Sequence, residues 1–308
     1  MADLILHHYP TSPFAEKIRT ILGFKRLAWK SVFIPPIMPK PDLVALTGGY
    51  RRTPVLQIGA DIYCDTSLIS DVLERLQPSP SLYPPAVEGA SRLLAQWADT
   101  ALFWTVIPCA FQPSTAGEIL AGMTPEQMKA FGADRAAFRG NAPRLSSADA
   151  MGMLPLYLDR LAGMLAGGQP FLFGDEASIA DFSVYHCLWF LQRVKSLAPL
   201  VEQKPALAGW YKRVVAFGHH ESSAMSSTEA LAVARGSRPA PAGEGDFVDH
   251  HGVSLGDEVA VMPTDYGIDP VQGRLVAATA SEFAVERKFE TGTLVVHFPR
   301  IGFQLKKA

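Results

Sequence analysis

The sequence predicts a chain of three parts: an α/β domain, an all-helical domain and a small all-β extension. Residues 1–80 give the order strand, helix, strand, short helix, strand, strand, helix, which is typical of a mixed sheet with helices beside it. Apolar residues at helical spacing dominate residues 85–235. After a stretch rich in Gly, Pro and Ala at 236–245, apolar and polar residues alternate over residues 246–308 as they do in short strands.

Composition favours an ordinary globular protein. The 308 residues carry a formal net charge of −2, which does not favour a nucleic-acid partner. No apolar run approaches the ~20 residues that a membrane span needs, and the first ten residues lack the pattern of a secretory signal. The three cysteines are far apart and form no CxxC pair, which favours a reducing compartment. We therefore expect a cytoplasmic protein that binds neither nucleic acid nor membrane.

The N-terminal part opens with a short apolar strand at residues 4–8. Ser12 then precedes Pro13, and this pair is typical of a helix start, because proline suits the first helical position and serine caps it. A second strand is expected at residues 29–34. Residues 35–46 contain a proline-rich loop followed by a brief helical turn. A strand–helix–strand beginning of this kind predicts a parallel pair of strands.

The stretch from residue 52 to residue 74 predicts a hairpin followed by a capped helix. Pro54 opens a strand at 55–58, a Gly-Ala-Asp turn follows, and a second short strand runs over 62–64. Asp65 and Thr66 then supply capping side chains before an amphipathic helix. Such a helix start carries free N–H groups and a partial positive charge, so it can hold a carboxylate.

This unit resembles the glutathione-binding half of the thioredoxin-like domain of glutathione transferases. The resemblance implies that Pro54 is the cis-proline of that domain, and that Asp65 and Thr66 grip the γ-glutamyl end of glutathione. The family more often has Glu-Ser at these two positions, so Asp-Thr is a conservative departure. Taken alone, Asp65 and Thr66 are more typical of a plain helix cap than of a binding site.

A second segment, SPFAEKIR, resembles the SPF-x-x-x-(V/I)-R segment of plant-type and bacterial glutathione transferases. The resemblance implies that the Ser12 hydroxyl donates a hydrogen bond to the glutathione sulfur and is the catalytic residue. A free thiol has a pKa near ~8.5, and a hydroxyl donor at a helix start lowers it. Tyr9 and Thr11 carry competing hydroxyls, but Ser12 directly precedes the Pro-Phe of the segment. A helix cap is the alternative role of Ser12.

The resemblance also implies contacts along the rest of the tripeptide. Arg52 is expected to pair with the glycyl carboxylate, and Thr53 and Val55 to bind main-chain groups as one strand binds another. Lys40 is a further candidate contact, although the proline-rich loop leaves its position open. A solvated surface arginine is the alternative for Arg52.

The helical part contributes one candidate to the site. An apolar stripe over residues 93–104 is more typical of a core than of a ligand pocket. In the resembling family the end of this helix faces the glutathione site. The resemblance thus makes Trp104, together with Tyr9 and Phe14, a candidate to line the pocket of a second, apolar substrate.

The most specific family feature lies at residues 171–182. Ser178 and Asp181 stand at capping-box spacing within Gly-Asp-Glu-Ala-Ser-Ile-Ala-Asp. Glutathione transferases carry G-D-x-x-[ST]-[IL]-A-D here as a buried folding element. We therefore assign these two residues a structural role and not a place in the site.

The extension after residue 246 departs from the two-domain transferase pattern. Five strands are expected, with turn signals between them, at residues 258–262, 273–279, 283–289, 293–298 and 303–306. A segment of this size suggests a small antiparallel barrel of the SH3-like kind. It could pack on its own subunit, support a dimer or bind a partner. The histidine pairs of the chain show no metal-ligand spacing, so no metal site is expected.

Together these features predict a cytoplasmic glutathione transferase-like enzyme that acts in detoxification. Glutathione would be the co-substrate, a small apolar electrophile its partner in the reaction, and a homodimer the form expected by resemblance. One alternative is a non-catalytic regulatory or protein-binding member of the same fold. Another is a glutathione-dependent isomerase, dehalogenase or ether-cleaving enzyme that uses the same thiolate.

Overall fold

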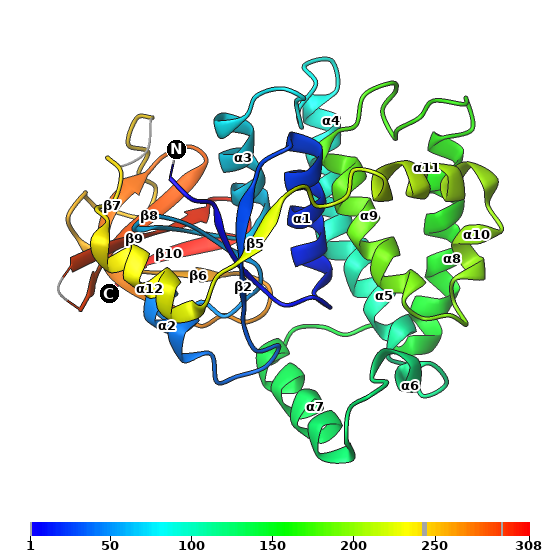
Figure 1. Ribbon diagram of the computed structural model, residues 1–308, viewed down its shortest axis with the longest axis horizontal. Helices are drawn as coiled ribbons and strands as arrows, with labels where there is room; N and C mark the ends of the chain where they lie inside the picture. The colour runs from blue at the N-terminus through cyan, green and yellow to red at the C-terminus, as the bar shows by residue number, and fades with distance from the viewer. Residues whose placement is uncertain (1, 242–244, 291) are drawn as a thin grey trace.

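A computed structural model describes residues 2–241, 245–290 and 292–308, and it confirms the predicted fold class (Figure 1). The predicted linker at 236–245 therefore lies partly outside the described residues. The N-terminal elements follow the predicted order. They are β1 (Ile5–His8), α1 (Pro13–Lys25), β2 (Trp29–Phe33), α2 (Pro41–Thr47), β3 (Val55–Ile58), β4 (Asp61–Cys64) and α3 (Thr66–Leu76).

Helices alone make up the next part of the chain, from residue 88 to residue 215. They are α4 (Glu88–Trp97), a π-helical turn (Ala98–Leu102), α5 (Phe103–Ala110), α6 (Ala116–Ile119), α7 (Pro125–Arg139), α8 (Ser147–Met164), α9 (Ile179–Gln192), α10 (Pro199–Glu202) and α11 (Pro205–Val215). The predicted capping box starts α9. The buried carboxylate of Asp181 accepts hydrogen bonds from the backbone of Ser178 and Leu172 and from the indole of Trp210. These partners give Asp181 a structural place at the base of the bundle.

The remaining elements return the chain to the sheet. They are β5 (Ser222–Ala224), α12 (Ser227–Gly236), β6 (Glu258–Pro263), β7 (Val271–Ala278), β8 (Glu282–Phe289), β9 (Gly292–Pro299) and β10 (Phe303–Lys307). The five C-terminal strands match the predicted strands to within two residues at each end. We call residues 246–308 the C-terminal module. No helix in the described part of the chain is long and apolar enough to cross a bilayer.

One continuous sheet joins the first and last parts of the chain, in the order β10-β6-β7-β8-β9-β4-β3-β1-β2-β5. Strand β4 pairs in parallel with β9, with Ile62 opposite Val296. The C-terminal module therefore extends the N-terminal sheet, and the finer expectation of an SH3-like barrel is not confirmed. At the other end β5 pairs in parallel with β2. Sequence patterning missed β5 because it is three residues long and exposed.

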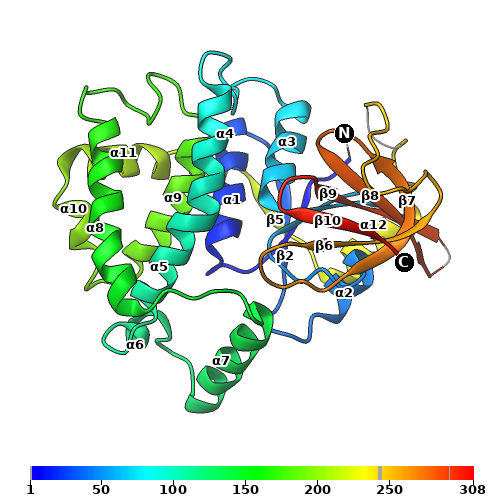
Figure 2. The same cartoon turned by 180° about the vertical axis from the view of Figure 1, so that it is seen from behind.

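Two hydrophobic cores lie on opposite faces of the N-terminal sheet. Successive side chains of a strand point to opposite faces, so Leu56 enters one core and Val55 the other. The first core continues through α1 and α3 into the helical bundle. The second continues into the C-terminal module, where Val55 shares a cluster with Val296 and Phe298. From behind, the bundle and the C-terminal strands flank α1 on either side (Figure 2).

Candidate functional site

Strand pairing brings three predicted site segments to one edge of the sheet. Val55 of β3 lies opposite His7 of β1 and opposite Cys64 of β4, and both pairs are antiparallel. The start of β3 and the ends of β1 and β4 therefore share an edge. Helices α1 and α3 begin from that edge, with Ser12 and Asp65 as their N-cap residues.

Ser12 caps α1, as the sequence predicts. Its hydroxyl oxygen accepts the backbone N–H of Ala15 at 3.2 Å, and its own N–H donates to the Tyr9 carbonyl at 3.2 Å. Because the oxygen is the acceptor in the cap, the hydroxyl proton can still donate, and the neighbouring Tyr9 oxygen is one acceptor. Burial raises the pKa of Tyr9, and the neighbouring Ser12 hydroxyl opposes that rise. Tyr9 is therefore a neutral phenol beside Ser12, and Ser12 itself is only 2 % exposed.

The proline-led strand has the expected geometry. The peptide between Thr53 and Pro54 is cis, and Pro54 and Val55 are buried. The side chain of Thr53 accepts a hydrogen bond from the Lys40 ammonium at 3.2 Å. This bond places Lys40, which the sequence left open, next to the start of β3.

Lys40 is a buried cation whose hydrogen bonds, within the described residues, go to neutral oxygens. Besides Thr53 it reaches the Arg51 carbonyl at 3.4 Å, and its ammonium lies 5.7 Å from the centre of the Tyr9 ring. Burial, with the nearby charges of Arg135 and Arg51, lowers the pKa of Lys40 to about 8. A buried ammonium without a carboxylate is costly, so this position suits a ligand that brings one.

The start of α3 holds Asp65 and Thr66 as predicted. Asp65 has a backbone φ of 75°, and its carboxylate accepts the N–H of Ser67 at 2.9 Å. A φ in this range is uncommon for a residue other than glycine. The Thr66 hydroxyl accepts a hydrogen bond from the Lys17 ammonium at 3.3 Å. Asp65 is half-buried, whereas Thr66 is buried.

Sequence reasoning missed a buried charge network behind Thr66. The Lys17 ammonium also pairs with Asp99 at 2.6 Å, and the Nε2 of His186 lies 2.9 Å from the same carboxylate. Burial lowers the pKa of His186, so its neutral ring donates to Asp99 while Lys17 supplies the positive charge. Lys17, a lysine among the buried apolar residues of α1, is the one local signal that could have indicated this network. The network places the Lys17 ammonium, which Asp99 balances, against Thr66 at the start of α3.

Arg52 does not face an open subsite. Its Nη2 donates both to the carboxylate of Asp265 and to the carbonyl of Tyr266, in the loop between β6 and β7. The guanidinium also lies 3.9 Å from the centre of the Tyr266 ring. The residue expected to hold the glycyl carboxylate is therefore occupied by the C-terminal module. No sequence pattern linked these residues, because more than two hundred positions separate them.

A row of aromatic rings extends from the start of α1 to the C-terminal module. The ring centres of Phe14 and Phe103 are 4.7 Å apart, and those of Phe103 and Trp104 are 5.2 Å apart. The ring centre of Tyr266 lies 5.0 Å from that of Trp104 and 5.2 Å from that of Phe138. Two of the three predicted pocket residues, Phe14 and Trp104, are thus joined through Phe103, whereas Tyr9 packs against the second core. Tyr266 is a member of the row that sequence reasoning did not find.

Helix α7 contacts two loops near the predicted site and does not pack into the bundle core. None of its residues is buried. Its Asp134 pairs with Arg51 at 2.9 Å and accepts the N–H of Met38 at 3.1 Å. The backbone N–H of Gly267 donates to the Phe138 carbonyl at 2.8 Å. These contacts tie α7 to the loop before α2 and to the loop between β6 and β7.

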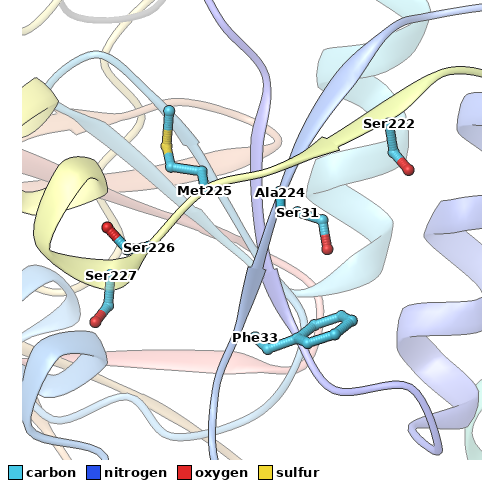
Figure 3. Close-up of a pocket in the computed structure, with 7 residues that line it drawn as sticks. All are labelled: Ser31, Phe33, Ser222, Ala224, Met225, Ser226 and Ser227. Atoms are coloured by element: carbon cyan, nitrogen blue, oxygen red, sulfur yellow. The ribbon is translucent and has the colours of Figure 1, made fainter.

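Two surface hollows lie away from the predicted site residues. One, of about 440 Å³, sits between β2, β5 and the start of α12 (Figure 3). Its lining consists of Ser31, Phe33, Ser222, Ala224, Met225, Ser226 and Ser227. The other, of about 810 Å³, lies between the end of α12 and the strands β7, β8 and β9. The described residues contain no group of three or more His, Cys, Asp or Glu side chains placed to hold a metal.

Two family descriptions match the chain. Residues 6–81 match "Glutathione S-transferase, N-terminal domain", and residues 142–213 match "Glutathione S-transferase, C-terminal domain". No curated protein matches the chain.

Several solved structures are similar to this one. A GST-like protein from Pseudomonas syringae is 43 % identical, with a TM-score of 0.84 and full coverage of both chains. A glutathione S-transferase from Rhodospirillum rubrum is 22 % identical over 69 % of this chain and 87 % of its own, with a TM-score of 0.51. The β-etherase LigF from Sphingobium sp. strain SYK-6 is 21 % identical over 69 % of this chain and 95 % of its own, with a TM-score of 0.54. The last two likenesses show the fold alone.

Proposed function

Because the chain belongs to the glutathione S-transferase family, we propose that it binds glutathione and activates the thiol for attack on an apolar electrophile. The observation that carries this proposal is the shared sheet edge, where the starts of α1 and α3 meet the cis-proline strand. Two helix starts at one edge favour anionic groups, because each carries free N–H donors and a partial positive charge. A tripeptide with a thiolate and two carboxylates suits such an edge.

Ser12 would hold the sulfur. Its hydroxyl oxygen already accepts from Ala15, so the remaining O–H proton can donate to the thiolate. A hydrogen bond to the charged form lowers the thiol pKa from ~8.5 and raises the thiolate fraction at neutral pH. The thiolate then attacks the electrophilic carbon. A carbon–sulfur bond forms, and the carbon–halogen bond of a chlorinated substrate breaks with release of chloride.

The rest of the edge would position the tripeptide. The γ-glutamyl carboxylate suits the N–H groups at the start of α3 and the Thr66 hydroxyl, with the Lys17 charge behind them. The γ-glutamyl ammonium suits the Asp65 carboxylate. Thr53 and Val55 would pair with the cysteinyl main chain as a strand pairs with a strand. Lys40, which lacks a carboxylate partner among the described residues, suits the glycyl carboxylate.

The test compares Ser12→Ala with the wild type in conjugation of glutathione to a chlorinated nitroaromatic. We expect kcat/KM to fall roughly a hundredfold, as for the loss of one donor to a reacting anion. Ser146→Ala is the matched control, because Ser146 caps α8 in the same way, through the N–H of Asp149 at 3.0 Å. Both variants lose a helix cap, at a cost of about 1 kcal/mol. Equal activity of Ser12→Ala and wild type would remove Ser12 from catalysis.

A second candidate function, a non-catalytic member of the fold, is favoured by two observations. Ser12 is only 2 % exposed, and Arg52 is engaged by Asp265. A protein of this kind would bind glutathione weakly or not at all and would act through its C-terminal module. Calorimetry with glutathione alone separates the two candidates, because it needs no electrophile.

We further propose a homodimer and a role in detoxification in the cytoplasm, both by analogy with the family. Light scattering after gel filtration measures the mass in solution. A mass of one chain at micromolar concentration would contradict the dimer.

A further inference from the structure

The loop between β6 and β7 brings a carboxylate to the edge where the tripeptide would lie. Asp265 and Tyr266 both contact Nη2 of Arg52, and Arg52 stands two residues before the cis-proline. The loop is held on its other side as well, because Gly267 donates to Phe138 of α7 at 2.8 Å. An element of the C-terminal module thus reaches the predicted subsite of the glycyl carboxylate.

The guanidinium of Arg52 is incompletely used. Both acceptors crowd on Nη2, whereas Nε is buried and has no hydrogen-bond partner in the described part of the chain. Guanidinium groups prefer to bind a carboxylate through two parallel N–H bonds. The pair with Asp265 is therefore not the best that Arg52 can make. A carboxylate that displaced Asp265 and bound Nε and Nη2 together would be better matched to it.

Exposure is unequal within the pair. The Arg52 side chain is 12 % exposed, whereas the Asp265 side chain is 43 % exposed. Solvent screens an exposed partner, and such pairs are weak and easily displaced. Asp265 nevertheless has the advantage of being part of the same folded chain, because an intramolecular partner has a high effective concentration. A free ligand carboxylate must compete with that concentration.

From these contacts we propose that Asp265 is a specificity-determining residue, an internal carboxylate that competes at Arg52 with the glycyl carboxylate of a peptide thiol. The inference rests on the proposed glutathione function and deepens it. In the wild type, recognition of the glycyl carboxylate falls to Lys40. The C-terminal module therefore sets how strongly the site distinguishes a thiol that ends in a carboxylate from one that does not.

Calorimetry with glutathione and with its glycine ethyl ester tests the inference on the full chain. The ester keeps the thiol and the γ-glutamyl end but lacks the glycyl charge. In Asp265→Asn we expect the dissociation constant of glutathione to fall on the order of tenfold, the worth of one charge-assisted hydrogen bond. The dissociation constant of the ester should not change. Asp269→Asn, an exposed aspartate of the same loop, is the control and should leave both ligands as in the wild type.

A second variant assigns the gain to Arg52. In Asp265→Asn/Arg52→Met the preference for glutathione over the ester should return to the wild-type ratio. If Asp265→Asn leaves that ratio unchanged, or tightens both ligands equally, the inference is overturned while the proposed function stands. Absence of glutathione binding in both wild type and Asp265→Asn contradicts the proposed function and the inference alike. Binding that appears only in Asp265→Asn supports the inference and identifies the wild type as a blocked site.

Discussion

At Ser12, one hydroxyl can serve two partners because it accepts and donates through different atoms. The oxygen completes the first turn of α1 by accepting from Ala15, which leaves the proton available to a sulfur. The Ser-Pro pair therefore predicts the cap, and the same geometry allows the catalytic role. What the residue pattern could not predict is how deeply the hydroxyl is buried, because burial depends on neighbours distant in the chain.

Lys40 gives a prediction at the same scale. The probe is S-methylglutathione, which binds without an ionisable sulfur. Lys40→Met should weaken its binding on the order of tenfold, since an ion pair with the glycyl carboxylate is lost. Lys30→Met is the control, because Lys30 hydrogen-bonds exposed Ser223 on the far edge of the sheet. Calorimetry measures both variants.

The low pKa of Lys40, about 8, gives this prediction a pH dependence. A lysine with a lowered pKa is charged below that value and neutral above it. Binding of S-methylglutathione by the wild type should therefore weaken as the pH rises above about 8. In Lys40→Met this weakening at high pH should be missing. Equal weakening in both proteins would mean that the ligand amine, and not Lys40, causes it.

Among elements, the seam between β4 and β9 depends on a buried ionic cluster. His297 of β9 lies 3.0 Å from Asp61 of β4 and 2.5 Å from Glu282 of β8. The ring also stacks on Tyr63, with 4.5 Å between centres. Burial alone would lower the pKa of His297, but its hydrogen bonds to the two carboxylates outweigh burial and raise it. The protonated ring thus bridges two negative groups across the seam.

His297→Gln should destabilise the protein by about 3 kcal/mol at pH 6, because two buried carboxylates lose their cation. The sign of the pH effect follows from the raised pKa. The contribution of His297 is fully present below the unfolded histidine pKa of ~6.5 and is lost as pH rises through the folded value. In denaturant unfolding, the difference in free energy of unfolding between variant and wild type should be smaller at pH 9 than at pH 6. Exposed His250→Gln is the control, and a gap that is constant with pH would contradict the bridge.

The elements themselves could be predicted well from local pattern. Alternation with a period of two predicted all five strands of the C-terminal module, and the Ser178 capping box predicted the start of α9. Partner choice between distant strands could not be predicted. The local sequence of β9 does not indicate that it pairs with β4. The sequence around Asp265 likewise does not indicate that Asp265 binds Arg52.

For the whole molecule, the shared second core implies that the C-terminal module and the N-terminal sheet unfold together. Phe298 of β9 is fully buried. Its ring centre lies 5.9 Å from that of Tyr50, which is in the loop before β3. Phe298→Ala should cost about 3–5 kcal/mol. Because the core is continuous, calorimetric unfolding should keep a single transition at a lower temperature.

Phe33 offers the matched control, since its side chain is 66 % exposed. Phe33→Ala should change the stability by less than about 0.5 kcal/mol. If Phe298→Ala instead produced two separate transitions, the C-terminal module would be an independent domain. The single sheet would then not act as a cooperative unit.

The site also belongs to the whole molecule, because three parts of the chain supply it. The N-terminal domain gives the two helix starts and the cis-proline, the bundle gives Asp99 and Trp104, and the C-terminal module gives the loop on Arg52. Sequence resemblance predicted the first set, and Trp104 of the second, as candidates. It could not locate the third, which lies outside the ordinary two-domain pattern.

The most direct test of thiol activation at Ser12 is a titration of the bound thiol. The ultraviolet absorbance of the thiolate reports ionisation of glutathione on the protein as pH is raised. We predict a pKa below the free value of ~8.5 on the wild type, and a return toward that value on Ser12→Ala. Identical titrations on the two proteins, or no bound thiolate at any pH, would contradict the account.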